Sequence, residues 1–284
     1  MTELEVIRKM NGIFASRGWR QKNKRLVDIV FNGFCDLLHN IDFLDGKELV
    51  LELTQRYLWI SKGDYSEYLA KAFNQIESKK LKNIERIYVK SILKPDDVTK
   101  VKSGDSVLYD LKGEWFYRLL NQNFENITIL PVKEITSEIE RNIIQGDLFI
   151  MVDDFLGSGQ TVFEAILDLP PLLQEKVNII AIVGHQFCLE RLLKKNIPHY
   201  VACKIKREIS DHYTATKIKE KEQIMRVLEK SLPNESQHQF SFGFGDCQAL
   251  VSMDRTPDNT FPIFWHQYVK NNKKYYPPFY RKTS

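Results

Sequence analysis

Hydrophobic residues near the N-terminus recur at helical spacing. Between residues 26 and 38 they return every three or four positions, which is typical of a helix with one wide apolar face. Helical patterns follow over residues 49–60 and 65–76, and none of these segments carries a recognisable catalytic spacing. The pattern therefore predicts a helical N-terminal addition over residues 1–80.

The spacing changes at about residue 84, where short apolar runs begin to alternate with helical patterns. Strand candidates cover residues 84–93, 127–132, 148–152, 178–184 and 200–205, with helical patterns at 114–121, 137–143 and 188–195 between them. Regular alternation of strands and helices favours a parallel sheet with right-handed crossovers. The sequence therefore predicts an α/β core over residues 81–232.

The last part of the chain has a different character. A helical pattern over residues 216–231 stops before Pro233, because proline cannot continue a helix. Two apolar arms, 250–253 and 261–265, then either pair as a hairpin or bracket a polar loop. Residues 275–281 combine tyrosines, prolines and a phenylalanine, which suggests a docking strip for a partner. We expect a closing segment with an aromatic tail over residues 233–284.

Composition excludes several classes of protein. Apolar residues make up 43% of the chain and charged residues 27%, and no apolar run approaches the roughly 20 residues of a membrane helix. The N-terminus mixes acids with bases, unlike a signal peptide, so we expect a cytoplasmic protein without a membrane partner. The four cysteines are too scattered to indicate a zinc site or a disulfide framework.

Charge gives little indication of a partner. A net charge of +4 is too small to argue for nucleic-acid binding by itself. Residues 17–25 concentrate five basic side chains around Trp19, which fits either a nucleic-acid contact or a solvated basic loop anchored by that tryptophan. The second interpretation is the more economical.

The chemistry of the chain concentrates between Asp147 and Leu167. An unbroken apolar run, 148–152, predicts a buried strand that ends at the acid pair Asp153 and Asp154. A glycine turn with two hydroxyl side chains, 157–161, then leads into a helical pattern. Backbone N–H groups at a helix N-terminus favour a phosphate, and carboxylates accept hydrogen bonds from sugar hydroxyls. The stretch therefore suits a ribose 5-phosphate, although a strand end followed by a helix cap would use the same residues.

The ten residues from Val152 to Thr161, VDDFLGSGQT, resemble the 5-phosphoribosyl-1-pyrophosphate (PRPP) signature of type I phosphoribosyltransferases. The resemblance implies a phosphoribosyltransferase-type parallel sheet flanked by helices, with PRPP as substrate and Mg²⁺ as cofactor. It gives the acid pair Asp153 and Asp154 the catalytic role of meeting the ribose hydroxyls, and through the ribose an indirect role at the metal. It implies that the 5-phosphate is bound by the turn formed by Gly157, Ser158, Gly159, Gln160 and Thr161.

Further ligand contacts are expected outside this signature. Phosphoribosyltransferases present a pyrophosphate loop after the first core strand, and Lys94 and Ser103 are placed to serve it, unless this segment is an ordinary surface connection. His185 follows a strand and either faces the ligand or is a structurally satisfied histidine. Arg255 is expected to meet a phosphate or carboxylate, oriented by Asp258 or Asn259, or else to tie down its own turn.

The segment from Arg255 to Trp265, RTPDNTFPIFW, carries a second resemblance. It is similar to the closing motif of phosphoribosyltransferase-like proteins of bacterial conflict systems, which occur in antiphage defence operons, including some retron operons with a reverse transcriptase. The resemblance implies an effector with protein partners, including a reverse transcriptase with its nucleic acid, and self-association is compatible with it. Three functions stay open: a phosphoribosyltransferase, a nucleotide glycosidic-bond hydrolase, and a non-catalytic nucleotide-sensing or scaffold subunit.

Overall fold

The computed structural model describes residues 1–94, 103–230, 232, 239–270 and 273–281. Its internal contacts divide the chain into two compact units. The helical unit contains Met1–Ile60 and Lys206–Ser284, and the sheet unit contains Ser61–Ile205. These units differ from the segments predicted at residues 80 and 232, because α4 (Tyr65–Phe73) packs on strands of the sheet, whereas α12 (Ala215–Glu229) packs on α3 (Leu44–Arg56).

The sheet unit is built on five parallel strands. They are β2 (Arg86–Ser91), β3 (Thr128–Pro131), β4 (Leu148–Leu156), β5 (Val177–His185) and β6 (His199–Ile205), and their order in the sheet is β3-β2-β4-β5-β6. Every residue of β5 is buried, as expected for a central strand covered on both faces. The prediction of a parallel α/β sheet flanked by helices is confirmed.

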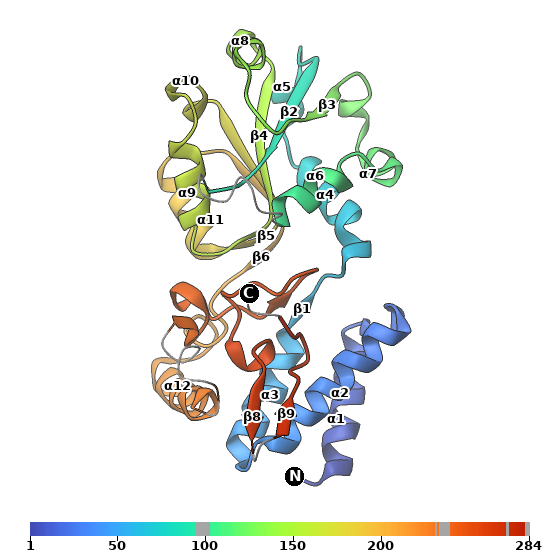
Figure 1. Cartoon of the computed structure of the whole chain (residues 1–284), viewed down its shortest axis with the longest axis vertical. Helices are drawn as coiled ribbons and strands as arrows, with labels where there is room; N and C mark the ends of the chain where they lie inside the picture. Colours follow the sequence, from blue (N-terminus) through green and yellow to red (C-terminus); the bar gives the residue numbers. More distant parts are fainter. Residues whose placement is uncertain (95–102, 231, 233–238, 271–272, 282–284) are drawn as a thin grey trace. The chain divides into compact units, whose positions relative to one another are not determined.

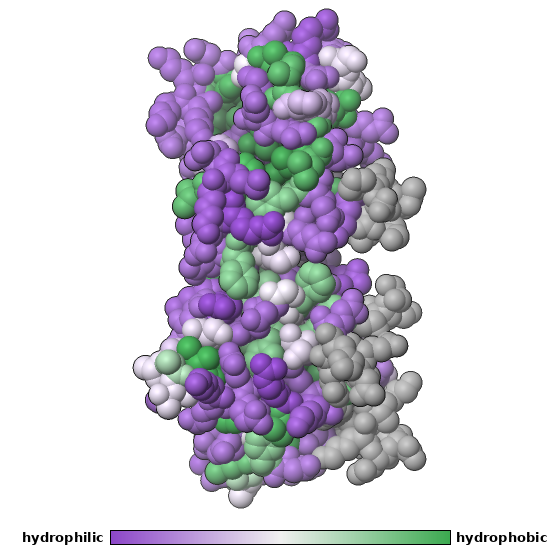
Figure 2. All heavy atoms as spheres, turned by 90° about the vertical axis from the view of Figure 1, so that its left-hand side faces the viewer, coloured by the Kyte–Doolittle hydropathy of each residue, from purple (hydrophilic) through white to green (hydrophobic). Residues whose placement is uncertain are grey.

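Helices cover both faces of this sheet (Figure 1). One face carries α4, α6 (Ser103–Asp110) and α7 (Glu114–Leu119), and the other carries α8 (Ser137–Gln145), α9 (Gln160–Leu167), α10 (Pro171–Gln174) and α11 (Gln186–Lys194). A short helix, α5 (Ser78–Leu81), precedes β2. Figure 2 shows hydrophilic residues over much of one side of the molecule, with separate hydrophobic areas between them. Within the described ranges, no helix is both long and apolar enough to cross a membrane.

The strand order of the sheet reverses between β2 and β4. The chain leaves β2 toward β3 on one side of the sheet, and β4 toward β5 and β6 on the other. Ligands of open α/β sheets bind outside the carboxyl ends of the strands at such a point of reversal. β2 ends at Ser91, opposite Val152, whereas β4 continues beside β5 as far as Leu156. The last four residues of β4 therefore extend past the end of β2 at this point.

The helical unit combines helices with very short strands. Its first helices are α1 (Glu3–Ser16), α2 (Lys24–Asn40) and α3, which confirms the helical character predicted for the N-terminal region. Its strands are β1 (Leu58–Trp59), β7 (Val251–Ser252), β8 (Tyr268–Lys270) and β9 (Lys273–Tyr275). β7 pairs with β1 in parallel, and residues 262–264 form a 3₁₀ helix. The apolar arms therefore bracket a polar loop, and the hairpin alternative is wrong.

Aromatic side chains from distant segments form the interior of the helical unit. The rings of Tyr57 and Phe279 stack with centroids 4.6 Å apart, and Trp19 and Phe34 pack beside them. Trp19 is 2% exposed, which confirms that it anchors the basic loop. Phe279 is buried too, so it belongs to the core and not to a docking strip. Tyr276 remains exposed, and docking through it stays a prediction.

Candidate functional site

The acid pair lies inside β4, not after it. The sequence predicts that the strand ends at Val152, but β5 continues to pair with it, joining Asp153 to Ala181 and Phe155 to Val183. The prediction of the strand end is wrong because neighbouring backbone, and not side-chain polarity, decides where a strand stops. Successive side chains of a strand point to opposite faces. Asp153 therefore lies on the face covered by α9 and α11, and Asp154 on the face covered by α4 and α6.

The two carboxylates consequently have different surroundings. Asp154 is 5% exposed, and its Oδ2 accepts a hydrogen bond from the Tyr65 hydroxyl at 3.0 Å. Asp153 is half-buried, and its Oδ1 accepts a hydrogen bond from the Asp154 N–H at 2.8 Å. A buried carboxylate needs fixed donors, since burial without them is costly. Asp153 is therefore the acid that a ligand can reach more easily, and Asp154 is built into the interior.

Lys62 contacts Tyr65, the residue that donates a hydrogen bond to Asp154. The Lys62 amine lies 4.5 Å from the centroid of the Tyr65 ring, within the range of a cation–π contact. It also pairs with the Asp110 carboxylate of α6 at 2.5 Å and donates to the Ser106 hydroxyl. Sequence reasoning missed both residues, because the helical pattern over residues 65–76 indicates a helix without showing which strand it covers.

The glycine turn leads directly into α9. Gly159 is the residue that precedes this helix, with a left-handed φ of +86°, and as a glycine it has no side chain to cap the helix N-terminus. The first turn of α9 contains no acidic residue, and the Ser158 hydroxyl accepts only a long hydrogen bond of 3.4 Å from the Gln160 N–H. The first N–H groups of a helix lack intrahelical partners and carry partial positive charge. This end of α9 is therefore chemically suited to an anion.

Gly159 is required by packing as well as by its φ angle. A Cβ atom at this position would lie 3.1 Å from the Cys188 sulfur and 3.2 Å from the Phe163 ring. Its neighbours belong to α11 and α9, so an added side chain would strain the turn and press on the helices. A substitution at Gly159 would therefore disturb the packing of the helices as well as the turn, and this residue is a poor place to test phosphate binding.

Lys94 reaches the same helix as the turn. Its amine pairs with the Glu164 carboxylate at 3.1 Å, and the Gln160 amide donates to that carboxylate at 2.8 Å. These two hydrogen bonds, the one from Gln160 first, lower the pKa of Glu164. Lys94 thus lies beside α9, close to the expected phosphate, while its role as a pyrophosphate contact stays a prediction.

Most of the segment expected to form the pyrophosphate loop, residues 95–102, lies outside the described residues, as does the Ser103 side chain. The backbone of α6 begins at Ser103. A Cβ atom at Gly104 would lie 3.0 Å from the Ser91 Cβ and 3.5 Å from the Val152 carbonyl oxygen. The first turn of α6 therefore packs closely against the end of β2 and against Val152 of β4, the residue before the acid pair.

His185 fits a structural role. It is fully buried at the end of β5, and its Nδ1 accepts a hydrogen bond from the Phe187 N–H at 3.2 Å. It thereby caps the N-terminus of α11. This geometry supports the interpretation of His185 as a structurally satisfied histidine.

Arg255 lies in the helical unit and is exposed. Asp258 pairs with Arg281 at 3.4 Å, and the Asn259 amide donates to the Phe244 carbonyl at 2.8 Å. Both candidate orienting side chains thus have other partners, and their orientation of Arg255 stays a prediction. A ligand contact of Arg255 itself stays a prediction.

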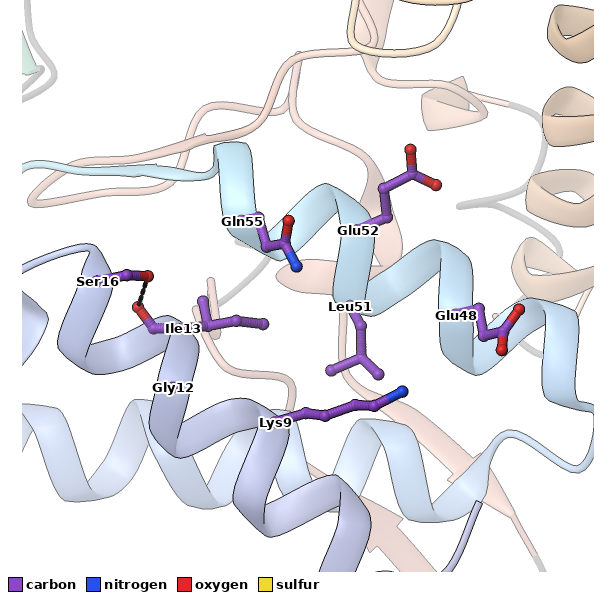
Figure 3. Close-up of a pocket in the computed structure, with 8 residues that line it drawn as sticks. All are labelled: Lys9, Gly12, Ile13, Ser16, Glu48, Leu51, Glu52 and Gln55. Atoms are coloured by element: carbon purple, nitrogen blue, oxygen red, sulfur yellow. Dashed lines mark hydrogen bonds between the residues drawn. The ribbon is translucent and has the colours of Figure 1, made fainter.

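A separate cleft of about 640 Å³ lies between α1 and α3 (Figure 3). Lys9 extends past Leu51 toward α3, and Glu48 and Glu52 lie on the α3 side. Glu52 already pairs with Lys221 at 3.2 Å. The cleft combines carboxylates with an apolar floor and lacks the glycine turn and the helix N-terminus that suit an anion. The β4–α9 region is therefore the stronger candidate site.

The described residues contain no group of three or more His, Cys, Asp or Glu side chains arranged to hold a metal ion.

Comparison with known proteins identifies one family. The family model PRTase-CE, of phosphoribosyltransferase type, matches residues 35–281, well over half of the chain. The match includes the acid pair, the glycine turn and the segment around Arg255. A search of curated proteins finds no match.

Proposed function

The chain belongs to PRTase-CE, a phosphoribosyltransferase-type family, and on this premise we propose that its β4–α9 site binds the ribose 5-phosphate group of PRPP or of a nucleotide. One observation carries the proposal. The accessible carboxylate of Asp153 and the N-terminus of α9, which a glycine precedes, follow one another at the point where the strand order reverses. A ligand with hydroxyls next to a phosphate satisfies both features.

The turn from Gly157 to Thr161 binds the phosphate in this proposal. The N–H groups at the start of α9 point toward the helix N-terminus, where the helix dipole favours negative charge by about 0.3–1 kcal/mol. Ser158 and Thr161 are half-buried and add two hydroxyl donors. No acidic side chain in the first turn of α9 competes for these donors.

Asp153 binds the ribose. Its carboxylate accepts hydrogen bonds from the two vicinal hydroxyls, and a hydrogen bond to a charged group contributes about 1.5–3 kcal/mol. Asp154 already accepts the Tyr65 hydroxyl in the interior, so it supports the strand end from the opposite face. This division assigns direct recognition to Asp153 and a supporting role to Asp154, and it refines the equal roles that the motif alone implies.

Magnesium fits this site as part of the substrate complex. Mg²⁺ is usually bound by one or two carboxylates together with substrate phosphates. The donor set present, with Asp153 as the accessible carboxylate at the end of β4, agrees with that mode better than with an all-protein metal site. When bound, Mg²⁺ would neutralise charge on the pyrophosphate that leaves. The contribution of the chain is to position the ribosyl phosphate for substitution at its anomeric carbon.

Binding of the phosphate is tested by isothermal titration calorimetry with ribose 5-phosphate and with ribose. The parent should bind the phosphorylated sugar and bind ribose at least about tenfold more weakly. The double variant Ser158→Ala/Thr161→Val should lose affinity for ribose 5-phosphate, whereas Thr128→Val, on the exposed part of β3, should not. Equal binding of both sugars by the parent would contradict the proposal.

The type of reaction is decided by its products. The protein is incubated with PRPP, Mg²⁺ and free bases, and separately with nucleotides, and the products are followed by mass spectrometry. A new nucleotide with released pyrophosphate indicates a phosphoribosyltransferase, whereas a free base with ribose phosphate indicates a glycosidic-bond hydrolase. Binding without any product indicates a nucleotide-sensing or scaffold subunit that uses the same site.

The cellular role proposed is that of an effector in bacterial antiphage defence, with protein partners that include a reverse transcriptase and its nucleic acid. The similarity of the segment Arg255–Trp265 to closing motifs of conflict-system proteins supports this role. Co-expression with neighbouring genes followed by size-exclusion chromatography should show co-elution, and phage plating should show protection that Asp153→Asn abolishes. A protein that always elutes alone and gives no protection would contradict it.

A further inference from the structure

Arg191 contacts the glycine turn from a different crossover. It lies on α11, and its Nη1 donates a hydrogen bond to the Ser158 carbonyl oxygen at 2.7 Å. Its guanidinium carbon also lies 4.4 Å from the centroid of the Phe163 ring of α9. The contact is short and charge-assisted, which makes it stronger than a neutral hydrogen bond. An exposed arginine is thus held at two points, both of them at the start of α9.

The partner of Arg191 is a backbone carbonyl, and this has a geometric consequence. The peptide bonds of the described chain are all trans. In a trans peptide the C=O and the following N–H point in opposite directions. Since the Ser158 carbonyl points to Arg191 on α11, the Gly159 N–H points away from α11. The guanidinium thereby fixes the direction of one backbone donor of the turn.

The same peptide has a second orientation available to it. Gly159 has no side chain and occupies the left-handed region at φ +86°, so rotation of the peptide that precedes it meets little steric resistance. In the rotated form a carbonyl oxygen would face the side of the turn where the N–H now points. A carbonyl there would repel an anion, because its oxygen carries partial negative charge.

We propose that Arg191 is a positioning residue of the phosphate site, which holds the Ser158–Gly159 peptide with its N–H directed toward the bound phosphate. The inference rests on the proposed function, since it assigns a role at the same site. It adds a residue that lies outside the sequence motif. The Phe163 ring keeps the planar guanidinium in place, and a lysine would lose this stacking and the fork of donors.

Calorimetry with ribose 5-phosphate tests the role in binding. Arg191→Gln should weaken binding by about tenfold or more, and Arg191→Lys should recover part of the loss, because the amine can still donate to the carbonyl. Lys194→Gln is the matched control, as it removes the same charge from an exposed position of α11. Parent-like binding by Arg191→Gln, or an equal loss in Lys194→Gln, would overturn the inference.

A measurement without ligand separates this inference from the proposed function. The amide ¹⁵N chemical shift of Gly159 responds to the hydrogen bond that the preceding carbonyl accepts, and it can be followed by NMR in the ligand-free protein. Arg191→Gln should move this signal well beyond the change caused by Lys194→Gln. An unmoved Gly159 signal would overturn the positioning role. If Arg191→Gln moves the Gly159 signal but the parent binds no ribose 5-phosphate, both the phosphate-directed role and the proposed function are contradicted.

Discussion

The interiors of the two units are built from different side chains in different ways. In the sheet unit much of the core comes from contiguous, mostly apolar runs, such as 149–152 and 177–183, whose strands lie next to one another. In the helical unit single aromatic residues come together from places as distant as Trp19, Tyr57 and Phe279. A contiguous run places many core residues with one strand. A core assembled from single residues of distant segments depends on each ring separately, so single substitutions there should destabilise the fold more.

The largest effect is expected from Phe279→Ala in the helical unit. Phe279 is 6% exposed and contacts the rings of Trp19, Phe34, Tyr57 and Trp59. Truncating a buried phenylalanine costs about 3–5 kcal/mol, because it leaves a cavity. Urea unfolding should show this loss, while Tyr280→Ala, at a 46% exposed position, should change far less. If Phe279→Ala unfolds at the same urea concentration as the parent, the tail does not belong to the core.

Tyr65→Phe is the corresponding change in the sheet unit. It removes the hydroxyl that donates to the buried Asp154 and keeps the ring in place. Loss of a donor to a buried polar group costs about 1–3 kcal/mol, and this loss should be visible in thermal or urea unfolding. Tyr109→Phe, at a 77% exposed position, is the control and should be neutral. A neutral Tyr65→Phe would mean that Asp154 does not depend on this hydrogen bond.

A third effect concerns pH and the helical unit. Burial raises the pKa of Glu229 to about 6 from its usual 4.5, although hydrogen bonds from the Ser241 hydroxyl and the Phe242 N–H lower it in part. The folded protein therefore binds this proton more tightly than the unfolded chain does. The resulting stability is fully present below pH 4.5, and it is lost as the pH rises through 6. Its size is about 2 kcal/mol for this shift.

The comparison that isolates this effect is between the parent and Glu229→Gln, unfolded with urea at pH 4.5 and at pH 7. The stability of the parent relative to the variant should fall by about 2 kcal/mol between the two pH values. Glu220→Gln, exposed on the same helix, should show no such change. A constant difference between parent and Glu229→Gln would show that Glu229 titrates normally.

The smallest effect on stability is expected at Lys94. Its ion pair with Glu164 is partly exposed, and such pairs contribute little, so Lys94→Gln should melt close to the parent temperature. If Lys94 exchanges Glu164 for pyrophosphate, calorimetry with Mg²⁺ and pyrophosphate should show a several-fold weaker affinity in this variant. Lys112→Gln, at an exposed position of the same unit, should bind like the parent. An unchanged affinity in Lys94→Gln would assign the lysine to the surface.

The sequence was sufficient to predict the sheet and to indicate the candidate site. Both depend on contiguous residues: the strands are apolar runs, and the acid pair and the glycine turn lie within ten positions of each other. It could not show that β4 continues through Asp153 and Asp154, because the pairing partners Ala181 to Gly184 lie in another strand. Two carboxylates after an apolar run look like the end of a strand, whatever lies beside them.

The supporting side chains could not be predicted for a related reason. Tyr65 precedes Asp154 by 89 positions, and Arg191 follows Ser158 by 33. Each contact depends on which helix covers which face of the sheet, and a helical pattern does not carry that information. The motif therefore indicates the groups proposed to meet the ligand, and the topology adds side chains that contact those groups.

The central claim is that Asp153 and the glycine turn together bind a ribose 5-phosphate, and calorimetry of Asp153→Asn tests it most directly. The substitution keeps the shape of the side chain and removes its charge, so ribose 5-phosphate should bind at least about tenfold more weakly than to the parent. Asp168→Asn, which removes the same charge from an exposed position after α9, should bind like the parent. Equal affinity of Asp153→Asn and the parent, or no binding by the parent, would contradict the account.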